Sequence, residues 1–353
     1  MTHASRQLLP SLLAVLSLTL YAAGCRGAST GGSDDPDAAE PMPDSAVSDV
    51  DAAPQIGCDP YEPRLGTTST FIGPSGLEAR LLGMFDSAQD ELFVMMYVST
   101  QESFSDRLIA AHQRGVDVRV LLDGDHPGNG DARSSLMSAG VAVRDAPDSF
   151  VNAHSKLLLI DNRELVLMSS NLTFSSMNDE RNHGVVLQDP EDVFDARAIF
   201  DSDWTGEGFP DLGCTRLVVS PINARQRLLD HINRAENTLE LELLYLSDAT
   251  IRNAVEQRHA DGVAVRVLLN NDQDNRDTAM ELDQMGVPAR VLSTPDVHAK
   301  LIVADGVPLV GSHNMSFTSI NSNREVGAMV LDPTAAATIL ATFESDWNSG
   351  FTP

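Results

Sequence analysis

The chain has 353 residues, and its 51 acidic and 24 basic residues give it a formal charge of −27. From residue 66 onward, 42 acidic and 21 basic residues leave a charge of −21. Non-specific nucleic-acid binding depends on lysines and arginines that neutralise phosphates, so this charge disfavours a nuclease. Positive potential focused inside one cleft keeps nuclease activity open as an alternative.

Residues 1–25 are predicted to form a signal peptide. Arg6 precedes an apolar stretch that ends at Cys25 and is too short for a good membrane-spanning helix. The small residues 22–24 directly before Cys25 resemble a bacterial lipoprotein cleavage site. This resemblance implies a lipid on Cys25 and an exported protein anchored to the outer membrane, on the periplasmic or the cell-surface side. Cleavage beside Cys25 followed by secretion is the alternative.

Residues 26–65 are predicted to be a disordered acidic linker. They are rich in Gly, Ser, Pro, Ala and Asp, and they cannot bury enough apolar surface to offset chain entropy. If Cys25 carries a lipid, Cys58 and Cys214 remain as one pair in an exported protein, where disulfides persist. We therefore predict a Cys58–Cys214 disulfide, with two free thiols as the alternative.

Residues 66–210 and 211–353 are predicted to be two copies of one domain. Gly115 lies opposite Gly262 when RLIAAHQRGVDVRVLLDGD is aligned with NAVEQRHADGVAVRVLLNND, and IFDSDWTGEG matches TFESDWNSG. Short apolar runs such as LFVMMYV and LELELLYL alternate with amphipathic helices, which are predicted at residues 75–88, 101–114, 221–235 and 249–260. Helices between buried strands indicate α/β sheets with covered faces.

Lysine occurs only twice in the chain, and each lysine lies two residues after a histidine. The pairs are His154 with Lys156 and His298 with Lys300, while the other 22 basic residues are arginine. A chain that prefers arginine keeps lysine where a compact ammonium is needed. The alternative is two solvated side chains on one face of a strand. Because the pattern occurs twice and uses every lysine, we predict that both pairs are site residues.

The same residues surround both pairs. The first set is His154, Lys156, Asp161, Ser169 and Asn171, and the second is His298, Lys300, Asp305, Ser312 and Asn314. These sets resemble the doubled HxKxxxxD and GSxN motifs of the phospholipase D superfamily, from about Phe71 to the C-terminus. The resemblance implies two similar α/β sandwich halves related by a pseudo-twofold axis, with one active site between them. Met168 replaces the usual glycine and is expected to crowd the phosphate pocket. The second copy is one residue shorter between its aspartate and asparagine.

The resemblance also implies cleavage of a phosphodiester without a metal or a cofactor. One neutral histidine attacks phosphorus and becomes a phosphohistidine, and the other protonates the leaving alcohol and then activates water. Preorganised donors stabilise the charge on the non-bridging oxygens. The expected donors are Lys156, Lys300, Ser169, Asn171, Ser312 and Asn314.

Several other polar residues receive separate predictions. Asp161 and Asp305 are candidate catalytic residues by their place in the motif, although their position at a strand end favours a role in bracing the backbone. Three histidines on predicted helices are expected to face solvent, namely His112, His231 and His259. The acid-rich loops DGDHPGNGD and NNDQDNRD lack the ligand spacing of a calcium loop, so solvated loops are predicted there.

A gap-free alignment of NLTFSSMNDERNHGVVLQD with NMSFTSINSNREVGAMVLD places Asn182 opposite Glu325. The family commonly has a carboxylate here that orients the catalytic imidazole. A carboxylate favours imidazolium, so we expect His298, backed by Glu325, to be the general acid. His154, backed by Asn182, is then expected to be the neutral nucleophile. A shifted alignment would give the role to Glu180.

Together these patterns predict an exported phospholipase D-like enzyme that hydrolyses phosphodiester bonds of phospholipids and is held to the membrane by a lipid anchor. Two enzymatic alternatives are phosphatidyl transfer, as in cardiolipin synthases, and cleavage of nucleic acid. A lipoprotein that has lost activity and binds a phosphorylated ligand is the non-enzymatic alternative, because a fold does not fix a function.

Overall fold

The computed structural model describes residues 59–353, so the predicted leader, Cys25 and Cys58 lie outside the described part of the chain. Two side chains that lie just before the predicted linker end at residue 65 contact later parts of the chain. Tyr61 Oη lies 2.6 Å from Nδ1 of His231, and the buried side chain of Arg64 lies 2.5 Å from the Asp192 carboxylate. Tyr61 and Arg64 thus contact the folded part of the chain, whereas Leu65 is 92% exposed. The boundary between linker and domain stays a prediction.

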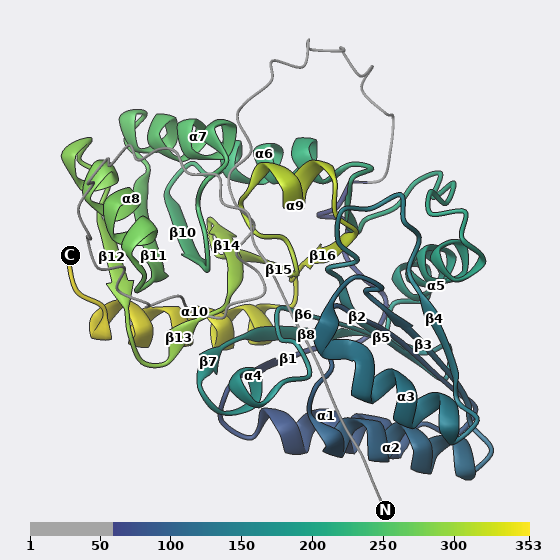
Figure 1. Cartoon of the computed structure of the whole chain (residues 1–353). Coiled ribbons are helices and arrows are strands. Elements are labelled where there is room, and N and C mark those ends of the chain that lie inside the picture. Colours follow the sequence, from purple (N-terminus) through teal and green to yellow (C-terminus); the bar gives the residue numbers. More distant parts are fainter. Residues whose placement is uncertain (1–58) are drawn as a thin grey trace, which may run out of the picture. The chain divides into compact units, whose positions relative to one another are not determined.

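The first half forms a seven-stranded mixed sheet in the order β1-β8-β6-β5-β2-β3-β4 (Figure 1). Strands β2, β3 and β4 are parallel, whereas β5 pairs with β2 in the antiparallel direction. Its strands are β1 (Thr68–Ile72), β2 (Glu91–Met96), β3 (Asp117–Leu122), β4 (Ala142–Asp145), β5 (Lys156–Ile160), β6 (Glu164–Met168) and β8 (His183–Leu187). The inner strands are buried on both faces because helices or another sheet cover each face.

The second half repeats this arrangement. Its sheet has the order β12-β11-β10-β14-β15-β16-β9, which is the order of the first sheet read from the opposite edge. Its strands are β9 (Val218–Ser220), β10 (Thr238–Leu243), β11 (Ala264–Asn270), β12 (Ala289–Leu292), β14 (Lys300–Ala304), β15 (Val307–Gly311) and β16 (Glu325–Met329). The predicted α/β fold with two similar halves is confirmed.

Helices cover the outer face of each sheet, and a shared apolar layer joins the inner faces. One outer cluster packs the first sheet against its helices, and another does the same for the second sheet. The third cluster combines side chains from both sheets and from two long helices. The helices are α1 (Leu77–Ser87), α2 (Glu102–Gln113), α3 (Gly130–Ser138), α4 (Phe174–Asn178), α5 (Pro190–Thr205), α6 (Ala224–Asn233), α7 (Ala249–Ala260), α8 (Gln273–Gln284), α9 (Phe317–Asn321) and α10 (Pro333–Ser349), with one 3-10 turn, η1 (Pro127–Asn129).

Short segments cross between the halves near both motifs. Strand β7 (Glu180–Arg181) of the first half pairs with β13 (Asp296–Val297), which leads into the second motif. On the other side, the backbone N–H of Val151 donates to the backbone oxygen of Ser322, and that of Arg324 donates to the backbone oxygen of Asn152. Each half therefore places the segment after its own motif beside the histidine of the other half.

The predicted elements agree with the structure except at the motif strands. The four predicted helices are present, with ends no more than three residues from those expected. Gly115 and Gly262 end their helices with φ values of 96° and 94°, which glycine adopts without strain. The sequence predicts motif strands that begin at His154 and His298, but the strands begin at the lysines two residues later, so both histidines lie just before a strand. The one-residue difference between the copies lies in the turn that follows each of these strands.

Two further observations concern the predicted anchor and disulfide. None of the helices in residues 59–353 is long and apolar enough to span a membrane. Cys214 is disulfide-bonded. Because Cys58 lies outside the described residues, the Cys58–Cys214 pairing stays a prediction.

Candidate active site

Lys156 and Lys300 are the first residues of β5 and β14, and both side chains are almost completely buried. The Nζ atom of Lys156 lies 2.8 Å from Nε2 of His154 and 2.8 Å from its backbone oxygen. The Nζ atom of Lys300 lies 2.9 Å from the backbone oxygen of His298. Neither lysine is a solvated surface residue, in agreement with the argument from lysine usage.

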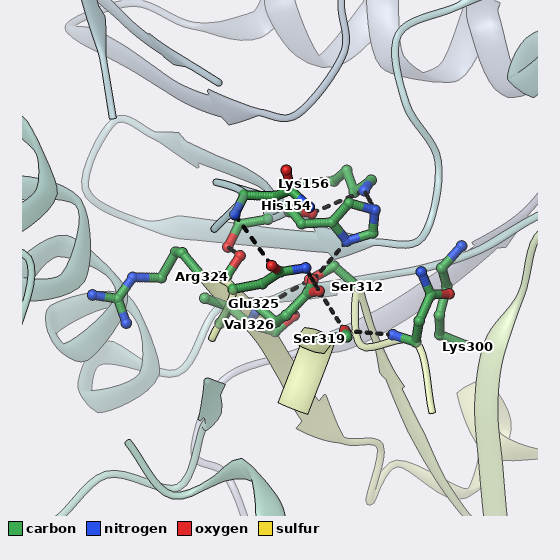
Figure 2. Close-up of polar contacts among 12 residues, drawn as sticks. His154, Lys156, Lys300, Ser312, Ser319, Arg324, Glu325 and Val326 are labelled. Atoms are coloured by element: carbon green, nitrogen blue, oxygen red, sulfur yellow. Dashed lines mark hydrogen bonds and ion pairs between the residues drawn. The ribbon is translucent and has the colours of Figure 1, made fainter. Parts of the chain in front are cut away.

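His154 is held by a carboxylate from the second half. Its Nδ1 atom lies 2.8 Å from Oε2 of Glu325. Figure 2 marks this contact between the two side chains with a dashed line. The other carboxylate oxygen accepts a hydrogen bond from Oγ of Ser319 at 2.5 Å. Burial alone would raise the pKa of Glu325, but the electrostatic interaction and hydrogen bond with His154, together with the charge of Lys156, lower this pKa to about 2. Glu325 is therefore ionised and fixes a proton on Nδ1 of His154.

Aromatic side chains form a wall beside this histidine. The ring of Tyr97 packs with its centroid 4.6 Å from that of His154, and Nζ of Lys156 lies 5.0 Å from the Tyr97 centroid. The ring of His126 packs edge-on against Tyr97 with a centroid distance of 5.1 Å. An aromatic face attracts a cation, so Tyr97 stabilises the ammonium of Lys156 where it is. No sequence pattern singles out Tyr97, because it directly follows an ordinary buried strand.

His298 is held by an amide from the first half. Its Nδ1 atom lies 2.9 Å from Oδ1 of Asn182, which also accepts a hydrogen bond from Oγ of Ser169. The nearest carboxylate oxygen belongs to Glu180 and lies 3.7 Å from Nδ1. Burial would raise the pKa of Glu180, but the charge of His298 and a hydrogen bond from Ser176 lower it.

The predicted partners of the two histidines are therefore wrong. Glu325 contacts His154 rather than His298, and Asn182 contacts His298 rather than His154. The physical reason is the crossing of segments between the halves, which places each orienting residue next to the histidine of the opposite repeat. The gap-free alignment itself is correct, because Glu180 does not take the place of Asn182.

A second pair of crossed contacts anchors these segments. Arg181 makes two bonds to Asp346 of α10, at 2.5 and 3.1 Å. In the equivalent place, Arg324 makes two bonds to Asp203 of α5, at 2.9 and 3.0 Å. Burial raises the pKa of both aspartates to about 6 although the arginines oppose this shift. Each bidentate pair fixes the residue directly before an orienting side chain.

The predicted phosphate ligands divide into two kinds. Ser169 donates its hydroxyl hydrogen to Asn182, and Ser312 forms hydrogen bonds with the backbone of Val326. Both hydroxyls thus have contacts within the protein, and their role as phosphate donors stays a prediction. Asn171 and Asn314 are buried, and within residues 59–353 neither side-chain oxygen has a hydrogen-bond partner. These two amides stay candidate phosphate ligands.

Asp161 and Asp305 brace the backbone at the far end of the motif strands. Asp161 accepts hydrogen bonds from three consecutive backbone N–H groups, at residues 89–91. Asp305 does the same at residues 236–238. Burial would raise the pKa of each carboxyl group, but these donors lower it. A five-residue strand spans roughly 16 Å, so neither aspartate acts at the histidines. Their assignment as catalytic residues is corrected.

Met168 differs from expectation, and His313 is a further buried group near the motif. The Met168 side chain is fully buried in the outer apolar cluster of the first half, so it does not crowd the phosphate pocket. His313 follows Ser312 and is fully buried, and neither ring nitrogen has a hydrogen-bond partner in the described part of the chain. Burial lowers its pKa to about 4, so His313 is neutral near pH 7.

The remaining predictions concern surface histidines and metal ions. His231 is completely buried, which contradicts its predicted exposure. Its Nδ1 atom forms a hydrogen bond with the hydroxyl group of Tyr61. Asp123 and Asp272 accept backbone hydrogen bonds in the two acid-rich loops. The two remaining acids of each loop are exposed, namely Asp125, Asp131, Asp274 and Asp277. Residues 59–353 contain no group of three or more His, Cys, Asp or Glu residues arranged to hold a metal.

The chain is similar to known enzymes of phospholipid metabolism. It is 30% identical over 122 residues to the mitochondrial cardiolipin hydrolase of Danio rerio, covering 33% of this chain and 54% of that protein. It is 33% identical over 110 residues to the cardiolipin synthase of Listeria welshimeri, covering 29% of this chain and 23% of that protein. The chain thus spans about half the length of the cardiolipin hydrolases that it matches.

A similar fold and a family profile complete the assignment. The phosphatidylserine synthase of Haemophilus influenzae has a TM-score of 0.62 at 12% identity, covering 80% of this chain and 85% of that protein. The profile of the family "Cardiolipin synthase, PLD-like domain" matches residues 81–204 and 228–347, one segment in each half and more than half of the chain. The protein therefore belongs to the phospholipase D-like family of cardiolipin synthase domains, with two such domains in one chain.

Proposed function

We propose that the protein is a phospholipase D-type phosphodiesterase that cleaves a phospholipid through a phosphohistidine on His154. The observation that carries this proposal is the pair of contacts to the His154 ring. Glu325 accepts from Nδ1 at 2.8 Å, and the ammonium of Lys156 lies 2.8 Å from Nε2. An ammonium has only donors, so Nε2 must hold a lone pair in this arrangement. A neutral ring with this lone pair is a nucleophile.

The corrected partners by themselves would reverse the two roles, because a carboxylate favours imidazolium. The contact with Lys156 supports the original assignment, since its ammonium disfavours a positive charge on the neighbouring His154 ring. The Glu325 carboxylate instead stabilises the charge that develops on His154 when Nε2 bonds to phosphorus, as the aspartate does in a Ser-His-Asp triad.

His298 is then the general acid. In the first step, Nε2 of His154 forms a bond to phosphorus while the bond from phosphorus to the alcohol oxygen breaks, and His298 gives its proton to that oxygen. In the second step, water gives a proton to His298 and attacks phosphorus, which releases His154. Lys156, Lys300 and the two asparagine amides supply charge and donors for the non-bridging oxygens.

The family and the relatives support a phospholipid as the substrate. By name, the cardiolipin hydrolase cleaves a phospholipid and the cardiolipin synthase forms one. Phosphatidyl transfer is the second candidate, because the family description and the Listeria relative both name a synthase. Transfer differs only in using an alcohol instead of water in the second step, so the same site serves both reactions.

One assay separates these activities. The purified chain is incubated in a chelator with mixed micelles of phosphatidylcholine, phosphatidylethanolamine, phosphatidylglycerol or cardiolipin, and separately with single-stranded DNA. We expect release of a headgroup and formation of phosphatidate. Cardiolipin formed from phosphatidylglycerol would favour transfer, and cleavage of DNA alone would refute a phospholipid substrate. If none of these substrates is cleaved and a phosphorylated ligand binds tightly, the non-enzymatic alternative is favoured.

We also propose that a lipid on Cys25 holds this enzyme at the outer membrane. Support comes from the residues before Cys25 and from the lipid substrate, which lies at a membrane. In a bacterial host, metabolic labelling with a fatty acid should mark the native chain, while Cys25→Ser should be unlabelled and recovered in the soluble fraction. An unlabelled native chain would contradict the anchor.

A further inference from the structure

Three consecutive residues of the first half, Arg181, Asn182 and His183, each contact an ionisable side chain of the second half. Their partners are Asp346, His298 and Glu242, at 2.5, 2.9 and 3.0 Å. Asp346 and Glu242 lie close enough to interact electrostatically, and the charge of Glu242 adds to burial in raising the pKa of Asp346. The contacts of Arg181 and His183 therefore form a continuous polar chain around the segment that holds His298.

The last of these contacts, between His183 and Glu242, is buried in an apolar layer. The side chains of His183 and Glu242 are 1% and 0% exposed. His183 points to the same face of β8 as Val185 and Leu187, which belong to the shared apolar cluster between the sheets. Moving two ionisable groups into such a layer costs free energy that their attraction often fails to recover. Packing alone therefore gives no reason for this pair.

The other half shows that the fold does not require it. Val326 follows Glu325 as His183 follows Asn182, and it is apolar. Met95 lies opposite the residue after Lys156 on the neighbouring strand, as Glu242 lies opposite the residue after Lys300. Met95 and Val326 both belong to the shared apolar cluster. At the positions equivalent to His183 and Glu242, the other side of the interface thus has the apolar residues Val326 and Met95.

The polar pair lies near His298, which is the motif histidine with the weaker orienting partner. His154 is oriented by an ionised carboxylate at 2.8 Å, and the charge attraction itself draws the two groups together. His298 is oriented by the neutral amide of Asn182, so its orientation depends on how firmly the backbone holds residue 182. Arg181 and His183 flank this residue, and both are tied to the second half.

We propose that His183 and Glu242 are positioning residues for His298. Their buried pair fixes Asn182 so that its carbonyl oxygen accepts the Nδ1 proton of His298, which directs Nε2 of that ring to the leaving alcohol. This inference rests on the proposed function for the role of His298. The Asp346 carboxyl group, whose pKa is raised to about 6 by burial and by the charge of Glu242 against the opposing effect of Arg181, completes the connection to residue 181.

The test replaces the pair by the residues of the other half, His183→Val with Glu242→Met. The double variant leaves no unpaired charge, so we expect it to fold with a Tm equal to or above that of the native chain. Its kcat should fall by about tenfold or more while KM changes by less than about twofold. The alkaline limb of the kcat profile should move to lower pH, because a poorly held Asn182 stabilises the His298 imidazolium less. Glu240→Gln is the matched control, since Glu240 lies two residues away and pairs with Arg266 instead. It should keep the native kcat.

A measurement without turnover separates this inference from the proposed function. At a pH at which His298 is neutral, nitrogen-15 NMR of labelled histidines, assigned with His298→Asn, should show the His298 proton on Nδ1 in the native chain and a mixture of tautomers in the double variant. If the native chain cleaves no phosphodiester, the proposed function fails while this signal still tests the positioning role. The positioning role would be overturned if the double variant kept the native tautomer of His298 and the native pH profile. If that variant does not fold, His183→Leu with Glu242→Leu also removes the polar contact, and the same criteria apply.

Discussion

His154 and His298 occupy the same place in their repeats, yet a single exchange of residue types gives them different partners. The first repeat has Glu180 and Asn182 where the second has Asn323 and Glu325. Each glutamate accepts a hydrogen bond from the equivalent serine, Ser176 or Ser319. The exchange moves the carboxylate from 2.8 Å to 3.7 Å from the imidazole. This difference gives the two histidines their separate roles in our account.

Exchanging these residue types in the first repeat should change the acid. The variant Glu180→Asn with Asn182→Glu gives His298 a carboxylate in direct contact, which raises the pKa of its imidazolium. The alkaline limb of the kcat profile should move up by roughly one pH unit. The reciprocal variant, Asn323→Glu with Glu325→Asn, removes the carboxylate from His154 and should lower kcat between about 10-fold and 100-fold. An unchanged alkaline limb in the first variant would refute His298 as the acid.

Lysine usage makes a second prediction at this scale. Lys156→Arg should lower kcat/KM by about tenfold or more, because a planar guanidinium cannot place one donor at Nε2 of His154 and another at its backbone oxygen within the same buried space. The matched control is Arg163→Lys, a change of the opposite sense at a side chain that is 70% exposed. Equal kcat/KM for both variants would mean that lysine at position 156 has no special role.

At the scale of elements, the repeat and its helices could be predicted from the sequence, but the crossing of segments could not. Hydrophobic periodicity is local, and it located the helices and the buried strands. The partner of His154 depends instead on β16 of the other half reaching across the interface. Glu240 and Glu242 indicate buried polar contacts, since two acids within the otherwise apolar run LELELLYL need buried partners. Their partners, Arg266 and His183, lie too far away in sequence to be inferred from it.

The crossed arginines should matter for stability more than surface arginines. Arg324 is completely buried with Asp203, so Arg324→Met leaves an uncompensated buried carboxylate. We expect a loss of about 3 to 5 kcal/mol in the free energy of unfolding, measured by urea denaturation. Arg163→Met at the exposed position should change it by no more than about 0.5 kcal/mol. Similar values for the two variants would contradict the anchoring role of the buried pair.

For the whole molecule, neither half contains a complete site, because each histidine takes its orienting partner from the other half. The chain is strongly acidic, yet its two lysines are concentrated at this buried interface. The surface charge thus disfavours nucleic acid while the site retains the positive charge that a single phosphodiester requires.

The buried acids should shape the pH dependence of folding. The pKa of Asp203 and of Asp346 is about 6 in the folded chain, mainly because of burial, against about 3.9 in an unfolded one. The folded state therefore binds more protons between these values, and Tm should fall as pH rises from about 4 to about 6. Glu325, whose pKa is lowered to about 2, contributes stability that is lost only as pH falls from about 4.3 towards 2. Scanning calorimetry of the native chain and of Asp203→Asn, which should show a shallower slope, tests this. A Tm that rises through this window would contradict it.

Trapping the covalent intermediate tests the central claim most directly. The native chain is mixed with substrate, quenched within milliseconds at high pH, where phosphohistidine survives, and digested with trypsin for mass spectrometry. Cleavage after the neighbouring basic residues places His154 in the peptide DAPDSFVNAHSK and His298 in VLSTPDVHAK. We predict an adduct on the first peptide, at His154. An adduct on the second peptide would show that His298 is the nucleophile and would contradict the assignment.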